Sequence, residues 1–322
     1  MLHYITGRPG SGKSETILQE LKNALAEGRN VLLLVPEQQA VLWESRLAET
    51  LPLSWQLRLE VTNFTRLANT VFRQYGGLAK PKIDDGGRTL VLWRAMLSVW
   101  DMLQVYNHGA DGREDKNIPL LTGAIGELKR NRVSPAALET AAGSLAADEG
   151  AAGLAGRLAD VSLIYAAYEE LLHLEYSDRE DVLAALSETL EKHPFFAGKT
   201  VFVDSFYSVT PPELRILRCA AAGADDLWVS FACDREDTGE LPFLRIRKFL
   251  QQMERIAADL GKTPHFINLT GDRRHDTPGL CAISAGLFRY DATPALSPEE
   301  TEKLPEGTTP AGDVSLYLCS DR

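Results

Sequence analysis

A phosphate-binding pattern stands close to the N-terminus. Residues 7–14 read GRPGSGKS, which matches G-x-x-x-x-G-K-[ST] at every fixed position. The glycines let successive backbone N–H groups face one anion, and the helix that should follow adds the positive end of its dipole. In this pattern Lys13 reaches the β- and γ-phosphates of a nucleotide and Ser14 holds Mg²⁺. We therefore expect ATP and Mg²⁺ as cofactors, held by Gly7, Arg8, Pro9, Gly10, Ser11, Gly12, Lys13 and Ser14.

A second acidic element is needed beside such a loop, because Mg²⁺ takes a carboxylate and hydrolysis needs a base for the attacking water. The apolar run 201–203 ends in Asp204, the candidate second ligand of Mg²⁺. Ser205 stands where a catalytic Glu is expected, and an ordinary hydroxyl is a poor base. We therefore expect nucleotide binding with slow or absent hydrolysis. The plainer interpretations are a turn-forming Asp204 and a Gly-rich loop without a ligand.

Alternating strand and helix patterns surround these residues. The loop follows a short apolar segment and precedes a helical pattern that ends near Gly28. An unbroken apolar run stopped by Pro36 is typical of a strand covered on both faces in a parallel sheet. The fold class predicted is α/β, a parallel sheet flanked by helices. Its expected strands are 3–6, 31–35, 57–61, 200–206 and 227–231.

The middle of the chain lacks strand signals. From Gly76 to about Pro194 the patterns are helical, with the clearest apolar stripe over 154–172, which predicts an all-α insertion into the sheet domain. The apolar segment 314–319 starts a new strand three residues before the end, so we expect a fragment of a longer protein. The expected parts are 1–77 and 196–288 for the sheet domain, 78–195 for the insertion, and 289–322 for a linker and the start of another domain.

Composition excludes several classes of protein. The 322 residues are 44% hydrophobic and 25% charged, unlike disordered, collagenous or disulfide-stapled chains. A net charge of −11 argues against non-specific binding of polyanions, so any contact with DNA must be local. The four cysteines form no C-x-x-C pair and the six histidines no paired spacing, so zinc or metal catalysis has no support. With no signal peptide and no long apolar run, we expect a reduced, cytoplasmic protein.

Several blocks resemble a known family. GRPGSGKS, LLLVPEQQA, VTNFTRLANTVFRQYGG and VFVDSFYSVTPPELRIL, in this order, are similar to the opening of AddB, a subunit of the bacterial ATP-dependent helicase/deoxyribonuclease. The resemblance extends to about Leu260. It implies a RecA-like domain of the UvrD-type superfamily with a helical insertion. It also implies an enzyme subunit that works with an AddA-like helicase-nuclease on DNA ends for homologous recombination, with the nuclease domain and its iron–sulfur cluster outside this chain.

The resemblance also places some residues near DNA. In UvrD-like folds the segments after the second and third strands line the path of single-stranded DNA. An aromatic ring there can stack on a base, and a basic group can pair with a phosphate. The periodicity alone instead favours Phe64 as a core residue. The run Lys129-Arg130-Asn131-Arg132 contacts DNA or is a solvated helix end. The DNA candidates are Pro36, Gln38, Thr62, Asn63, Phe64, Arg66, Lys129, Arg130 and Arg132.

Two departures from working helicases bear on the role of ATP. Only six residues precede Gly7, too few for an adenine-reading glutamine motif, and Asp204-Ser205 replaces Asp-Glu. Both favour a structural or regulatory nucleotide over a motor. Two alternatives stay open: a P-loop kinase of a small molecule, and a scaffold subunit whose loop has lost its ligand.

Overall fold

The computed structural model describes residues 1–77, 83–107, 117–146, 149–176, 179–233, 241–271, 273–275 and 280. The expected linker 289–322, the strand 314–319, Cys281 and Cys319 lie outside these residues. Two compact units make up the chain. Among the described residues, the first unit contains Met1–Asn63, Phe196–Val209 and those from Ala220 onward, and the second contains those within Phe64–Phe195 and Thr210–Cys219. The sequence pattern placed the first boundary after residue 77, whereas the contacts of the chain divide it after Asn63.

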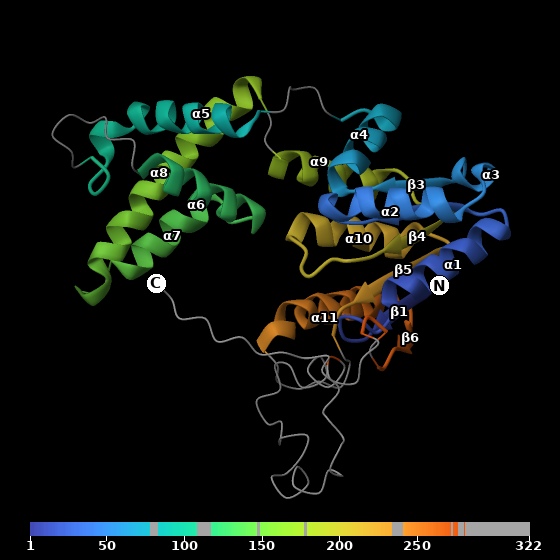
Figure 1. Cartoon of the computed structure of the whole chain (residues 1–322). Coiled ribbons are helices and arrows are strands. Elements are labelled where there is room, and N and C mark those ends of the chain that lie inside the picture. The colour runs from blue at the N-terminus through green and yellow to red at the C-terminus, as the bar shows by residue number, and fades with distance from the viewer. Residues whose placement is uncertain are drawn as a thin grey trace, which may run out of the picture. The chain divides into compact units, whose positions relative to one another are not determined.

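The first unit is built on a parallel sheet (Figure 1). Six strands of the described residues run in the order β3-β2-β4-β5-β1-β6, and every pairing is parallel. β5 therefore lies between β1 and β4. β1 leads into the loop of residues 7–14, called the P-loop below after its sequence pattern, and β4 leads to Asp204. This α/β arrangement confirms the predicted fold class and is RecA-like. The strands are β1 (Leu2–Thr6), β2 (Asn30–Leu34), β3 (Leu59–Thr62), β4 (Lys199–Val203), β5 (Asp226–Phe231) and β6 (His265–Asn268).

Successive side chains of each strand point to opposite faces of the sheet, so both faces need to be covered. Helices cover both of them. Ile5 of β1 joins one core with α1 (Lys13–Ala26) and α2 (Glu37–Thr50). Tyr4 faces the other way, where its hydroxyl donates to the Met253 carbonyl of α11 (Leu244–Asp259) at 2.9 Å. The unit also contains α3 (Leu53–Gln56), the 3-10 turn η4 (Leu241–Phe243) and the C-terminal part of α10 (Pro211–Gly223).

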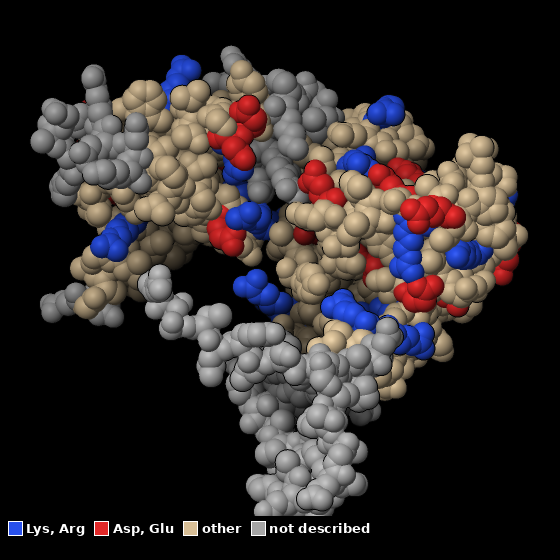
Figure 2. Space-filling model, in the orientation of Figure 1, with Lys and Arg blue, Asp and Glu red and all other residues tan. Residues whose placement is uncertain are grey.

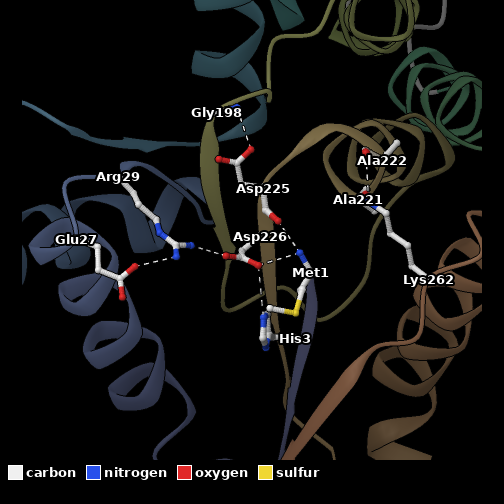
Figure 3. Close-up of polar contacts among 10 residues, drawn as sticks. All are labelled: Met1, His3, Glu27, Arg29, Gly198, Ala221, Ala222, Asp225, Asp226 and Lys262. Carbon is white, nitrogen blue, oxygen red and sulfur yellow. Dashed lines mark hydrogen bonds and ion pairs between the residues drawn. The ribbon is translucent and has the colours of Figure 1, made fainter.

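Charged groups anchor the amino ends of the strands (Figure 3). The Met1 ammonium donates to Asp226 Oδ1 at 2.8 Å, and Arg29 Nη1 pairs with Asp226 Oδ2 at 2.5 Å. Burial opposes ionisation of Asp226, but the hydrogen bonds and charges of Met1 and Arg29 outweigh it and lower the pKa of this carboxyl. His3 stacks on Trp228 with ring centroids 3.9 Å apart. These contacts hold β1 beside β5 at the edge opposite the P-loop.

The second unit is helical, as the sequence predicts for the insertion. Its core is formed mainly by α5, α6 and α8, with Leu92, Ile125 and Ile164 among the buried residues. The carboxylate of Asp160, 1% exposed, accepts backbone N–H groups from residues 104–106 at 2.7–3.1 Å. The elements are α4 (Phe64–Tyr75), α5 (Asp85–Ser98), η1 (Trp100–Met102), α6 (Ile118–Arg130), α7 (Pro135–Leu145), η3 (Glu149–Ala151), α8 (Ala152–Glu175) and α9 (Arg179–Lys192).

Among the helices in the described part of the chain, none combines the length and the apolar character needed to cross a bilayer.

Candidate nucleotide-binding site

The P-loop lies between β1 and α1, as its pattern requires. Gly12 precedes the helix with φ of +94°, a left-handed conformation that a β-carbon disfavours. Gly7 has φ of +156°, and a β-carbon there would lie 2.4 Å from Ser11 Oγ and 2.6 Å from the Leu269 carbonyl oxygen. Both glycines are therefore required for the close turn of the backbone.

Lys13 begins α1 and folds back over the loop. Its Nζ donates to the carbonyl oxygens of Gly7 at 2.8 Å and Arg8 at 2.7 Å. These bonds fix the ammonium beside the loop, where it would meet the phosphates of a nucleotide.

Asp204 follows β4 at the carboxyl edge of the sheet and is 1% exposed. Its Oδ2 accepts the hydroxyls of Ser14 at 2.8 Å and Ser205 at 3.0 Å, and its Oδ1 accepts the hydroxyl of Ser230 on β5. The structure thus brings the P-loop hydroxyl and the predicted carboxylate into direct contact, although they are 190 residues apart in sequence.

A cavity of about 590 Å³ opens beside these groups. Its size is in the range of sites for small ligands and cofactors. Besides residues of the P-loop, its lining includes Asp204, Ser205, Ser230, Gln39, Tyr207, Arg273 and Arg274.

The two arginines of this lining were not among the nucleotide-site candidates from sequence. The backbone N–H of Arg273 donates to the Gly10 carbonyl at 2.8 Å, and its Cδ lies 3.0 Å from where a β-carbon of Gly12 would stand. The run Arg273-Arg274 follows β6, a strand that the sequence pattern did not reveal. A basic pair a few residues after a strand at the carboxyl edge of the sheet is the signal that would have found them.

The donor set fits Mg²⁺ bound together with a nucleotide. Mg²⁺ prefers oxygen ligands and is commonly held by one or two carboxylates plus phosphates. Ser14 and Asp204 supply a hydroxyl and a carboxylate 2.8 Å apart, next to the phosphate-binding turn. Within the described residues no group of three His, Cys, Asp or Glu side chains forms a site that would hold a metal by itself.

The DNA candidates near the sheet divide by exposure. Gln38 and Arg66 are exposed, and Pro36 is partly so. Thr62, Asn63 and Phe64 are buried, with 1%, 7% and 4% of their surfaces exposed. These three side chains therefore do not present a surface to DNA in this structure, and Phe64 holds the core position that its periodicity favours.

The side chain of Lys129 is buried and ion-paired, unlike that of a residue that contacts DNA. Its side chain is 4% exposed, and Nζ lies 2.5 Å from Glu169 Oε1 and 3.0 Å from Asp181 Oδ1. Because the ammonium is buried and neutralised by two carboxylates, its role is to join α6, α8 and α9. We therefore correct the assignment of Lys129 as a DNA contact.

The rest of this basic run lies at the surface. Arg130 is 47% exposed and pairs with Glu127 at 2.5 Å, and Arg132 is exposed. On the face drawn in Figure 2, separate groups of Lys and Arg and of Asp and Glu lie within larger areas of other residues.

The fold is an α/β domain of the RecA-like class, and the loop with the sequence GRPGSGKS joins β1 to α1 within it. A model of the family described as "ADDB, N-terminal" matches residues 4–283. The chain therefore belongs to the AddB family, in which it matches the N-terminal region.

Relatives of the chain are named as the B subunit of an ATP-dependent helicase/deoxyribonuclease. The protein from Thermoanaerobacter sp. (strain X514) is 35% identical over 218 residues, which are 67% of this chain and 18% of the relative. The protein from Heliobacterium modesticaldum (strain ATCC 51547 / Ice1) is 30% identical over an alignment of 335 positions, which covers 99% of this chain and 26% of the relative. The matched regions thus cover 18% and 26% of the length of these two relatives.

Proposed function

We propose that this chain is the Mg·ATP-binding N-terminal region of an AddB-type subunit that engages DNA. The observation that carries the proposal is the contact between Ser14 and Asp204 beside the P-loop and its cavity. Lys13, Arg273 and Arg274 bring positive charge to the same cavity, which suits a triphosphate. Ser14 and Asp204 would hold Mg²⁺ from the protein side, with the phosphates of the nucleotide as its other ligands.

Hydrolysis is proposed to be slow because the described lining of the cavity offers no carboxylate that is poised as a base. Two acidic residues belong to this lining, Asp204 and Glu15. Asp204 accepts three hydroxyls, and Glu15 pairs with Arg46. Ser205 donates its own proton to Asp204 and has only a weakly basic hydroxyl oxygen for water. The nucleotide would then act as a regulator or a structural element.

The partners are proposed from the family. The relatives are named as subunits of a helicase/deoxyribonuclease, which supports an AddA-like partner subunit and DNA ends as substrate, in repair by homologous recombination. In this chain, exposed Gln38 and Arg66 are the candidates for contact with single-stranded DNA, with Arg130 and Arg132 as further basic groups.

Coupling between nucleotide and DNA tests this proposal. We expect a single-stranded oligonucleotide to change the affinity for Mg·ATP by at least about fivefold, the lower end of usual coupling between sites. Phosphate release should stay below about 0.01 s⁻¹ with or without DNA, far under common enzyme turnover. A sulfated polysaccharide at equal charge serves as the polyanion control.

Three outcomes would contradict parts of the proposal. Equal affinity for Mg·ATP with and without DNA would remove the coupling, and brisk phosphate release would remove the argument about Ser205. Transfer of the phosphoryl group to a small acceptor would support a kinase instead.

A further inference from the structure

Ser230 occupies a central place beside the nucleotide site. It lies on β5, in register with Ile5 of β1 on one side and one residue beyond the pairing of Val203 with Val229 on the other. Because β5 separates the P-loop strand from the strand that ends in Asp204, Ser230 is adjacent to both. Its side chain is buried, with the residue 4% exposed, and its hydroxyl donates to Asp204 Oδ1.

The two oxygens of Asp204 have different partners. Ser14 and Ser205 donate to Oδ2, whereas Ser230 donates to Oδ1. An Asp carboxylate rotates easily about χ2, so hydrogen bonds to one of its oxygens alone do not fix the plane of the group. A further hydrogen bond to the second oxygen, from a residue on a buried strand, does fix this plane. Ser205 reaches Asp204 only from a left-handed backbone with φ of +66°, whereas Ser230 lies in regular sheet.

We propose that Ser230 is a positioning residue that holds the carboxylate of Asp204 toward Ser14 and thereby sets how much Mg²⁺ strengthens nucleotide binding. The inference rests on the proposed function. Mg²⁺ demands near-ideal octahedral geometry, so the orientation of a single protein carboxylate matters. Groups that orient metal ligands commonly change metal affinity by about 10–100-fold. Ser230 would act on nucleotide binding through Asp204 and only when Mg²⁺ is present.

The test measures ATP affinity of the 322-residue chain with Mg²⁺ and with EDTA. Ser230→Thr and Ser230→Val have nearly the same shape and differ in the hydroxyl, so they share any packing defect. We expect Ser230→Val to weaken Mg·ATP binding by about tenfold and to leave the affinity in EDTA unchanged within about twofold. Ser230→Thr should stay close to the wild type in both conditions.

Thr200→Val is the matched control. It removes another buried hydroxyl, 2% exposed, from the amino-terminal half of β4, away from Asp204. We expect this variant to bind ATP as the wild type does. Melting temperatures of all variants report any general loss of stability. The ratio of the ATP affinities with Mg²⁺ and with EDTA does not depend on such a loss.

The outcomes separate this inference from the proposed function. If the Thr and Val variants have the same Mg²⁺ dependence, or if Ser230→Val loses affinity equally in EDTA, Ser230 does not position Asp204 for the metal. If the wild type itself binds no ATP under either condition, the proposed function fails and the inference falls with it.

Discussion

Replacing Lys13 by alanine is expected to weaken Mg·ATP binding by about 100-fold. The ammonium is held 2.7–2.8 Å from two loop carbonyls, next to the cavity, and would pair with two phosphates of the nucleotide. Hydrogen bonds to charged groups contribute about 1.5–3 kcal/mol each, so losing both costs about 3 kcal/mol or more. Calorimetric titration of the wild type and the variant measures the difference.

Lys22→Ala provides the control for a lost positive charge on the same helix. Lys22 also belongs to α1 but does not line the cavity. Its replacement should leave the affinity unchanged within about twofold. If Lys13→Ala bound Mg·ATP as tightly as Lys22→Ala, the phosphates would not lie on this loop.

Lys129→Met is expected to destabilise the helical unit by about 3 kcal/mol. The ammonium is buried between Glu169 of α8 and Asp181 of α9. Removing one member of a buried ionic network leaves the remaining charges without compensation, which commonly costs about 3–5 kcal/mol. The partial exposure of the two carboxylates, 24% and 22%, places the expected cost at the lower end. Urea denaturation followed by circular dichroism measures the change.

Arg130→Met is the matched control from the adjacent position. Arg130 is 47% exposed and pairs with Glu127, which is 65% exposed. Exposed pairs contribute about 0–1 kcal/mol, so this variant should unfold close to the wild type. Equal effects of the two substitutions would show that the burial of Lys129 does not matter for stability.

The contrast between these two basic neighbours shows what the sequence could predict. Lys129 and Arg130 form one basic run, and Lys129 lies four residues after Ile125, on the buried stripe of α6. A charge on that stripe needs its partners Glu169 and Asp181, which lie 40 and 52 positions further along the chain. Short-range periodicity does not show those partners, whereas the glycine-rich loop was selected as a candidate because its residues are contiguous.

The same reason explains which other residues of the candidate site the sequence could suggest. Asp204 was predicted because a carboxylate directly after an apolar strand is a local signal. Ser230 lies inside a strand, where the pattern gives no reason to select a hydroxyl, and Arg273 follows a short strand that has weak periodicity. The sheet and the helical insertion were predicted from apolar runs and stripes. The boundary after Asn63 depends on the packing of α4 against α9, a contact distant in sequence.

Titration of the wild-type chain with Mg·ATP is the direct test of nucleotide binding at this loop. We expect saturable binding of one nucleotide per chain, which weakens when Mg²⁺ is removed because Ser14 and Asp204 then have no metal to hold. An affinity that does not depend on Mg²⁺, or no saturable binding at millimolar nucleotide, would contradict the proposed Mg·ATP site.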